Sequence, residues 1–242
     1  MNKKNDKHPQ AMTLGSDVWK AMVVKGLERL GVSASPAMVD QLTAHARDML
    51  FWNKKTNLTS ITDPLDVAVK HVIDSGAAAV LFSEHEKVLD IGTGGGFPGI
   101  PLKILKPFLS LTLVDSSRKK VNFVKQVIRS LGLEDINAME SRGEELSLLP
   151  EHRGCYDTVI SRAFSGLDVF VPMALPFLKP CGRIIAMKGR ETEQETHLLE
   201  KISVKMNDGQ TLTADDFDLD IRSYELPHSD FQRSFMVIRL KK

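Results

Sequence analysis

The sequence predicts an α/β protein in which a doubly wound, mostly parallel sheet of seven strands follows an N-terminal helical extension. Three observations lead to this fold class. Apolar runs alternate with amphipathic stretches from about residue 87 onward, and alternating strands and helices give a mostly parallel sheet. A glycine-rich turn separates the first of these runs from the helix after it. Two apolar alternations near the end of the chain, residues 217–226 and 232–240, predict a closing antiparallel hairpin.

Capping residues predict three helices in the N-terminal part of the chain. Serine and aspartate side chains accept hydrogen bonds from the first free N–H groups of a helix, and proline fits its first turn. These signals place helices from Ser16 to about Leu30, from Ser35-Pro36 to about Phe51, and from Asp63-Pro64 to Leu81. We therefore expect a helical extension over residues 15–84, behind a polar segment, residues 1–14, that is expected to be disordered.

Residues 85–242 are expected to form the α/β core, as one structural unit with the extension. Besides the hairpin, strands are predicted for the apolar runs at 87–92, 111–115, 135–140, 156–161 and 182–187. Amphipathic stretches predict helices at 99–106, 117–131, 167–178 and 190–205. Most of these helices connect consecutive strands, which is why the strands are expected to run parallel.

The loop after the first strand is the strongest functional signal in the chain. Asp90 ends the strand, and glycines from Gly92 to Gly99 let the backbone approach a ligand closely. Ligands of open α/β sheets bind at the carboxyl ends of the strands. The sequence therefore predicts that this loop cradles a ligand.

Two cofactors compete for the loop. Gly94-x-Gly96-x-x-Gly99 fits the dinucleotide fingerprint. Asp90 argues against that cofactor, because a carboxylate beside the loop would repel its diphosphate. S-adenosylmethionine has an ammonium and a sulfonium and no phosphate, so an acid suits it. Asp115, which closes the second strand, is placed to accept hydrogen bonds from its two ribose hydroxyls.

Composition limits the compartment. No apolar run approaches the roughly 18 residues of a membrane span, and no signal-peptide core follows the polar N-terminus. Cys155 and Cys181 fit free thiols in a reducing compartment, so we expect a cytoplasmic protein without membrane contact. The seven histidines show no paired metal spacing, so no metal is expected. A monomer is the simplest expectation.

Charge limits how a nucleic acid would be held. The net charge is only +1, whereas proteins that bind nucleic acid through their overall charge are usually strongly basic. Any RNA contact is therefore expected from a local patch, mostly in segments that follow strands. The candidates are Lys54, Lys55, Arg118, Lys119, Lys120, Arg142, Arg162, Lys188 and Arg190.

Several blocks of the chain resemble the bacterial small-subunit ribosomal RNA guanine-N7 methyltransferase family, called RsmG or GidB. The first is Asn57-Leu58-Thr59-Ser60, followed by His71 and Asp74-Ser75. The others are Asp90-Ile91-Gly92-Thr93-Gly94 through Phe97-Pro98-Gly99-Ile100-Pro101-Leu102, Ser141-Arg142-x-Glu144-Glu145, Ser161-Arg162-Ala163-Phe164, and the weaker Lys188-Gly189. The glycine loop alone is typical of methyltransferases in general, and the Asn57 and Arg162 blocks make the resemblance specific.

This resemblance implies a class I (Rossmann-like) methyltransferase fold, S-adenosylmethionine as cofactor, and 16S rRNA in the small ribosomal subunit as substrate. With the loop analysis, it implies cofactor contacts at Asp90, Gly92, Gly94, Phe97, Asp115, Gly143, Glu144 and Arg162. The residues expected to position the guanine are Arg162, Lys188, His71 and Asn57, with Phe164 as a stacking wall. Ser141 and Glu144 also fit a capping box at a helix start, beside an adenine contact at Gly143 and Glu144.

The chemistry implied by the resemblance needs no general base. The N7 lone pair lies in the ring plane and attacks a methyl group without losing a proton, so the enzyme mainly aligns the reacting atoms. The segment after the fourth strand lacks the Asn/Asp-Pro-Pro-aromatic tetrad typical of amine methylation, and it lacks a cysteine nucleophile. Cys181 lies at the turn that enters the fifth strand, the wrong end of the sheet, and is interpreted as structural.

Two other functions remain open from the residues alone. One is methylation of a small molecule or a protein, which the helical extension and the low net charge permit. The other is a non-catalytic RNA-binding module that responds to S-adenosylmethionine. Loss of turnover with retained RNA binding in an Arg162→Ala variant would separate an enzyme from such a module.

Overall fold

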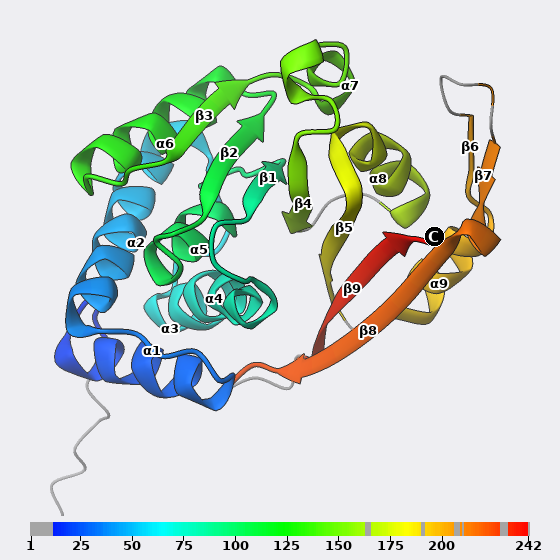
Figure 1. The fold of residues 1–242 in the computed structure, drawn as a ribbon. Coiled ribbons are helices and arrows are strands. Elements are labelled where there is room, and N and C mark those ends of the chain that lie inside the picture. Colours follow the sequence, from blue (N-terminus) through cyan, green and yellow to red (C-terminus); the bar gives the residue numbers. More distant parts are fainter. Residues whose placement is uncertain are drawn as a thin grey trace, which may run out of the picture.

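A seven-stranded sheet forms the centre of the molecule in the computed structural model, with helices on both of its faces (Figure 1). The structure describes residues 12–162, 166–189, 192–205, 209, 211–227 and 232–241. The strands of this sheet are β1 Lys87–Ile91, β2 Ser110–Asp115, β3 Ile136–Glu140, β4 Tyr156–Arg162, β5 Leu178–Lys188, β8 Phe217–Glu225 and β9 Gln232–Leu240. The predicted doubly wound fold class is confirmed.

The order of the strands creates a switch point beside β1. The sheet runs β3-β2-β1-β4-β5-β9-β8, with β1 to β5 parallel and β9 antiparallel to both β5 and β8. The chain proceeds outward from β1 through β2 to β3, then returns to the other side of β1 for β4 and β5. Ligands bind at the carboxyl ends of strands at such a point.

The three predicted N-terminal helices form where their caps indicate. Helices α1 (Asp17–Arg29) and α2 (Pro36–Thr56) begin after Ser16 and Ser35, whose side chains accept backbone hydrogen bonds. α2 continues five residues beyond the predicted end at Phe51. The third helical segment reaches Leu81 as predicted, through α3 (Pro64–Asp66), a π-helix (Val67–Ile73), α4 (Asp74–Ala77) and a 3-10 turn (Ala78–Leu81).

The helices of the core are α5 (Gly99–Leu105), α6 (Arg118–Ser130), α7 (Gly143–Leu146), α8 (Leu167–Ala174) and α9 (Thr192–Glu200). The predicted helix over 167–178 is too long, because Pro176 cannot donate to the carbonyl four residues earlier. A 3-10 turn (Leu175–Phe177) replaces the last turn, and β5 begins four residues before the predicted strand.

The predicted helix over 190–205 is also too long. α9 ends at Glu200, and Ser203–Lys205 forms β6, which pairs with β7 (Thr211–Thr213) in a separate two-stranded sheet. This pairing places Val204 opposite Leu212, which is buried in the core, so tertiary packing overrides the helical pattern.

Two hydrophobic clusters cover opposite faces of the sheet. Successive residues of a strand point to opposite faces, and Ile185 and Met187 belong to one cluster whereas Ile184 and Ala186 belong to the other. The first cluster contains Trp19 of α1 and side chains of α2 together with residues of the sheet, so the N-terminal helices share the core of the sheet.

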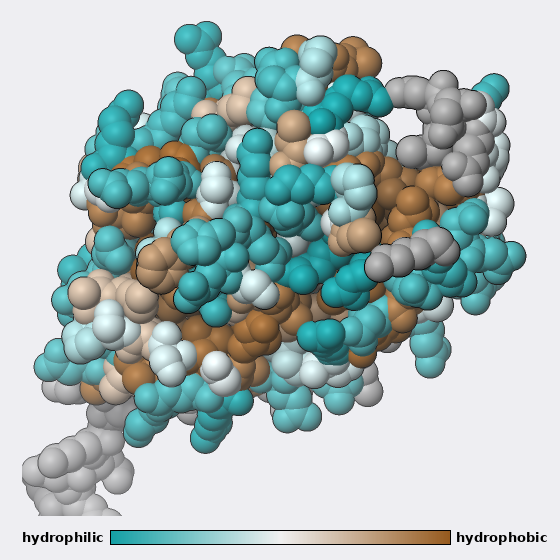
Figure 2. Space-filling model, in the orientation of Figure 1, coloured by the Kyte–Doolittle hydropathy of each residue, from teal (hydrophilic) through white to brown (hydrophobic). Residues whose placement is uncertain are grey.

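The surface view in Figure 2 shows most of the hydrophobic residues in recesses between protruding hydrophilic ones. Within the described residues, no helix combines the length and apolar character needed to cross a membrane. Apart from residues 12–14, the segment expected to be disordered lies outside the described residues.

Candidate active site

The buried Asp90 side chain holds the glycine loop after β1 in place through hydrogen bonds. This carboxylate is fully buried, and its Oδ2 accepts hydrogen bonds from Thr93 Oγ1 at 2.7 Å and from the N–H of Gly99 at 3.0 Å. Burial raises the pKa of Asp90 to about 7, against the opposing effect of these hydrogen bonds. The side chain therefore lies under the loop and is absent from the residues that line the neighbouring cavities.

A cavity of about 260 Å³ lies at the carboxyl ends of β1, β2 and β3, and we call it the Asp115 cavity. Its lining residues are Ile91, Gly92, Val114, Asp115, Ser116, Ser141, Arg142, Gly143, Glu144 and Met173. The structure thus brings together Gly92, Asp115, Gly143 and Glu144 of the sequence-predicted contacts, from three separate loops.

Asp115 orients the loop while keeping acceptor capacity. Its Oδ2 accepts from the N–H of Gly94 at 3.0 Å and its Oδ1 from the N–H of Ser117 at 2.8 Å. Each carboxylate oxygen has a second lone pair, so the group suits a ligand with two adjacent hydroxyls.

Gly94 leaves open space above the loop. It adopts a φ of 57°, and a Cβ built on it would meet no atom nearer than the Gly92 carbonyl oxygen at 3.9 Å. The loop backbone is thus free on its outer side for a ligand. This space and the Asp115 carboxylate fit the nucleoside part of S-adenosylmethionine.

The capping box expected at Ser141 and Glu144 is wrong by one residue. Helix α7 begins at Gly143, its cap is Arg142, and Glu145 rather than Glu144 accepts from the Arg142 N–H at 3.4 Å. Ser141 instead donates its hydroxyl to the Arg142 carbonyl. The extra residue before the helix leaves Glu144 exposed on the cavity wall.

A second cavity, of about 320 Å³, lies at the carboxyl ends of β4 and β5, and we call it the Arg162 cavity. Its lining residues are Ile61, Lys70, His71, Asp74, Arg162, Met187, Lys188, Gly189, Tyr224 and Arg233. These residues come from the loop after α2, from the π-helical segment and the start of α4, from the two strand ends and from the β8–β9 hairpin. Three of the predicted guanine-positioning residues, Arg162, Lys188 and His71, therefore meet in one cavity.

The Arg162 guanidinium is held on several sides. Its Nη1 donates to the Lys70 carbonyl at 2.7 Å and lies 3.5 Å from an Asp74 oxygen, and its Nη2 donates to His71 Nδ1 at 3.0 Å. Burial lowers the Arg162 pKa, while the charge of Asp74 opposes this shift. The Nε–H has no hydrogen-bond acceptor among the described residues, which leaves a donor for a ligand.

Two neutral histidines and Phe97 form a stack beside Arg162. The Phe97 ring lies between His45, at a centroid distance of 4.5 Å, and His71, at 4.8 Å. Since His71 Nδ1 accepts from Arg162, its Nε2 carries the proton and donates to Thr59 Oγ1 at 2.8 Å. Burial, reinforced by the charge of Arg162, lowers the pKa of His71 to about 3.

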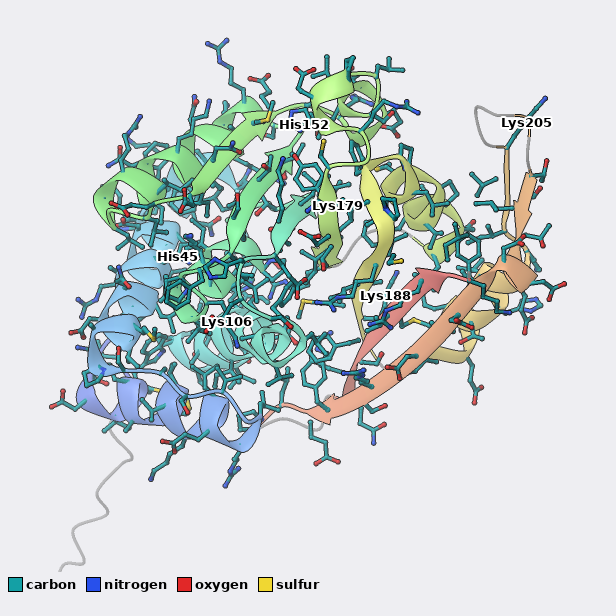
Figure 3. The ribbon with its side chains drawn as sticks, in the orientation of Figure 1. His45, Lys106, His152, Lys179, Lys188 and Lys205 are labelled. Carbon is teal, nitrogen blue, oxygen red and sulfur yellow. The ribbon has the colours of Figure 1, made fainter. Side chains whose placement is uncertain are left out.

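His45, labelled in Figure 3, reaches from α2 to the glycine loop, where its Nε2 lies 2.8 Å from the Gly95 carbonyl. Burial lowers its pKa to about 4, although this hydrogen bond opposes the shift. His45 was not predicted from the sequence. Its place in the apolar stripe of α2, between Leu42 and Met49, is the signal that marks it.

Asp74 connects the hairpin to Arg162. Its carboxylate is buried, accepts from the Tyr224 hydroxyl at 2.8 Å and lies 3.7 Å from Arg233 Nε. Tyr224 and Arg233 were not predicted as site residues. The alternating pattern of a hairpin shows which residues share a face, but not which part of the protein that face contacts.

Lys188 lies at the end of β5 beside β9, as labelled in Figure 3, and its Nζ forms a salt bridge with Glu195 Oε1 at 2.6 Å. The other Glu195 oxygen accepts from the N–H of Leu167. Glu195 therefore connects the starts of α8 and α9 to the cavity wall.

The remaining predicted residues lie elsewhere. Asn57 is exposed and caps the end of α2 in the left-handed conformation (φ 49°), while Thr59 is the residue of that loop that contacts His71. Phe97 lies in the histidine stack and is absent from the residues that line the Asp115 cavity. Phe164 and Arg190 lie outside the described residues. Cys181 is exposed near the amino end of β5, opposite to the cavities.

Comparison with known proteins gives consistent matches over most of the chain. A family model named GidB and described as rRNA small subunit methyltransferase G matches residues 38–219. The ribosomal RNA small subunit methyltransferase G of Geobacter sp. (strain M21) is 39% identical over 219 residues, which cover 90% of this chain and 96% of that protein. The protein of the same name from Alkaliphilus metalliredigens (strain QYMF) is 37% identical over 221 residues, covering 90% and 89%.

Solved structures extend the likeness of the fold. A SAM dependent methyltransferase from Aquifex aeolicus superimposes with a TM-score of 0.53 at 16% identity, covering 75% of this chain and 96% of that one. At this identity the likeness concerns the fold alone.

Proposed function

The chain belongs to the rRNA small subunit methyltransferase G family, and from this premise we propose that it methylates N7 of one guanine in 16S rRNA with S-adenosylmethionine as the donor. The observation that carries the proposal is the pair of cavities at one edge of the sheet. Gly92 of the loop lines the Asp115 cavity, and Phe97 of the same loop packs against His71 and Arg162, which line the other.

In this proposal the Asp115 cavity holds the nucleoside part of the cofactor. Asp115 accepts from the ribose hydroxyls, and the backbone at Gly143 and Glu144 faces the adenine. When bound, the cofactor supplies an electrophilic methyl group on a positively charged sulfur. Asp90 acts through the loop: its contacts to Thr93 and Gly99 hold the backbone that the cofactor touches.

The Arg162 cavity receives the guanine. Arg162 and Lys188 line this cavity from adjacent strand ends, and their N–H groups suit the O6 acceptor beside N7. Orientation by fixed donors lowers the barrier because the reacting atoms must lie in a line.

The state of the titratable groups agrees with a reaction that needs no base. His71 has both ring nitrogens engaged and a pKa near 3, and Asp74 is held by Tyr224 and Arg162. His71 therefore has no ring nitrogen left to accept a proton, and both Asp74 oxygens already face donors of the protein. N7 loses no proton during methyl transfer, so this arrangement suits it. A ribosomal substrate also implies a cytoplasmic enzyme.

Radiolabelled S-adenosylmethionine and small ribosomal subunits from cells that lack this protein test the proposal. The labelled RNA is reduced and cleaved with aniline, which cuts at 7-methylguanosine. We expect label in 16S rRNA and one cut at a single guanine. Label without a cut would contradict the N7 assignment, and absence of label on subunits and on protein-free RNA would contradict the RNA substrate.

An Arg162→Ala variant tests the role of the second cavity in the same assay. We expect methylation to be lost while binding of the cofactor and of bulk RNA persists, because Arg162 lies outside the Asp115 cavity. Arg222→Ala is the matched control, since Arg222 is an exposed arginine on β8 that pairs only with Asp220 among the described residues. Equal turnover of the two variants would contradict the assignment.

A further inference from the structure

Helix α6 carries an unusual concentration of positive charge. Its thirteen residues include Arg118, Lys119, Lys120, Lys125 and Arg129 and no acidic residue, in a chain whose net charge is only +1. Arg118, Lys119, Lys125 and Arg129 are exposed. Within the part of the chain that the structure describes, none of the five takes part in a salt bridge.

Most of these charges lie along one line of the helix. Arg118, Lys125 and Arg129 are spaced by seven and four residues, so they lie on the same face. The opposite face carries Phe123, Val124 and Val127, which are buried in the core. At a rise of about 1.5 Å per residue the line is roughly 16 Å long. Because the apolar face packs against the core, the three charged side chains point toward solvent on the same side of the helix.

The end of α2 extends this basic face. Gln41 of α2 donates to the Leu131 carbonyl just after α6, whereas Trp52 packs against Phe123 in its first half, so the two helices run antiparallel. Lys54 and Lys55, both exposed, therefore lie toward the start of α6. In Figures 1 and 2, α6 and α2 lie along the left side of the molecule, and hydrophilic side chains protrude at the upper edge over α6.

An exposed aromatic ring accompanies the lysines. The side chain of Phe51 is 71% exposed, and it shares a helix face with Lys54 and Lys55, three and four residues later. Aromatic rings beside cations are the combination that binds unpaired nucleotides, because a base stacks on the ring while its phosphates meet the charges.

The basic face adjoins the Asp115 cavity. Helix α6 begins just after Asp115 and Ser116, both of which line that cavity. A nucleic acid bound along α6 therefore reaches the edge of the sheet at which both cavities lie.

We propose that the outer face of α6, with Phe51, Lys54 and Lys55 of α2, is the surface on which the RNA backbone docks. This inference rests on the proposed function in taking RNA as the partner. It separates two tasks: the docking face binds phosphates through charge, and the Arg162 cavity selects the base. A local basic face of this kind allows a chain with a net charge of only +1 to bind RNA.

The salt dependence of RNA binding tests the proposal. The triple variant Arg118→Gln, Lys125→Gln, Arg129→Gln removes the three exposed charges of this line and keeps good helix formers. The control Lys25→Gln, Arg29→Gln, Lys205→Gln removes three exposed charges on α1 and β6. Dissociation constants for protein-free 16S rRNA are measured over a series of KCl concentrations, with cofactor affinity and thermal stability alongside.

The slope of log K against log [salt] is negative, and each lost phosphate contact reduces its magnitude by about 0.7–0.9. We therefore expect the magnitude of the slope to decrease by roughly 2 in the triple variant. We expect the control to keep the wild-type slope, and both variants to keep cofactor affinity. A wild-type slope in the triple variant, or an equal decrease in the control, would overturn the proposal. A different result would assign the face to a membrane. In that case vesicles of anionic lipid would bind the wild type but not the triple variant, and the two proteins would have equal slopes for RNA.

Phe51→Ala tests the aromatic part separately. Phe108, 60% exposed near the amino end of β2, provides the matched control Phe108→Ala. We expect binding of single-stranded RNA to weaken at least about fivefold for Phe51→Ala and to stay unchanged for Phe108→Ala. Equal affinities would remove Phe51 from the docking face. The salt dependence of RNA binding is measured without methylation. Failure of the N7 proposal in the aniline assay is therefore distinguishable from failure of the docking face.

Discussion

At the scale of single residues, the Arg162 cavity depends on groups kept in one protonation state. His71 is neutral and accepts a hydrogen bond, which lets it contact a guanidinium without repelling it. Asp74 supplies the only carboxylate contact of Arg162 among the described residues. The result is an arginine whose plane is fixed by a carbonyl, an imidazole and a carboxylate.

An Arg162→Lys variant keeps the charge and loses this plane. A single ammonium cannot reach both the Lys70 carbonyl and His71 Nδ1 while presenting a donor to the cavity. We expect kcat/KM for methylation to fall about 10- to 100-fold. Steady-state kinetics with small subunits measure this, with cofactor affinity as the internal control. A variant with wild-type kcat/KM would show that charge alone is required.

The buried histidines make stability depend on pH. Because the pKa of His45 falls from 6.5 to about 4 on folding, the unfolded chain binds a proton between these values and the folded chain does not. Stability from this group is present above about pH 6.5 and is lost as the pH falls toward 4. The loss is on the order of 3 kcal/mol.

His45→Gln isolates this effect, since glutamine keeps a donor for the Gly95 carbonyl. Urea unfolding at pH 7.5 and at pH 4.5 gives the free energy of unfolding of both proteins. We expect the wild type to lose more stability than the variant between the two pH values. Parallel losses would mean that His45 titrates normally in the folded state.

At the scale of elements, β1, its glycine loop and α5 act as one unit. A Cβ on Gly99 would lie 2.1 Å from Leu113 Cδ2 and 2.8 Å from Asp90 Oδ2, so this glycine allows α5 to approach β2. Gly94 differs, because its Cβ direction is open. One glycine of the loop therefore serves packing, and the other keeps space for a ligand.

Gly94→Ala and Gly132→Ala form a matched pair. Both glycines have φ near 60°, and a Cβ meets nothing closer than 3.9 Å at Gly94 and nothing within 4 Å at Gly132. Each substitution is expected to cost about 1 kcal/mol through the left-handed backbone. Only Gly94→Ala places a methyl group where the cofactor is proposed to lie. Calorimetric titration with S-adenosylmethionine should show at least about tenfold weaker binding for Gly94→Ala alone. Equal affinities would contradict this placement.

At the scale of the whole molecule, the Arg162 cavity needs three distant parts of the chain. The π-helical segment of the N-terminal part, the ends of β4 and β5, and the C-terminal hairpin each supply a wall. Tyr224 bonds Asp74 across 150 positions of sequence. The family model ends at residue 219, so Tyr224 and Arg233 lie beyond the matched segment.

Tyr224→Phe removes this connection and leaves the ring that stacks on Phe235 at 4.4 Å. The carboxylate loses one donor, so we expect the free energy of unfolding to fall by about 1–3 kcal/mol and kcat to decrease. Tyr156→Phe is the control, because that hydroxyl contacts His152 at the opposite end of β4. We expect it to lose stability with kcat unchanged. Equal kcat in both variants would limit Tyr224 to a structural role.

The sequence determined the parts of this protein whose signals are local. Caps at Ser16, Ser35 and Asp63, the glycine loop and the apolar runs act within a few residues. They predicted the N-terminal helices, the seven strands of the central sheet and residues that line the Asp115 cavity. The glycine loop could be identified because only backbone without side chains can make its turns.

Tertiary structure alone decided the rest. Pairing of β6 with β7 ended the preceding helix at Glu200, where the sequence pattern was helical. Packing also turned His45 and Tyr224 toward Phe97 and Asp74, which their own neighbours in sequence do not indicate. Burial set their protonation, and burial is a property of the assembled core, so no local pattern of residues could report it.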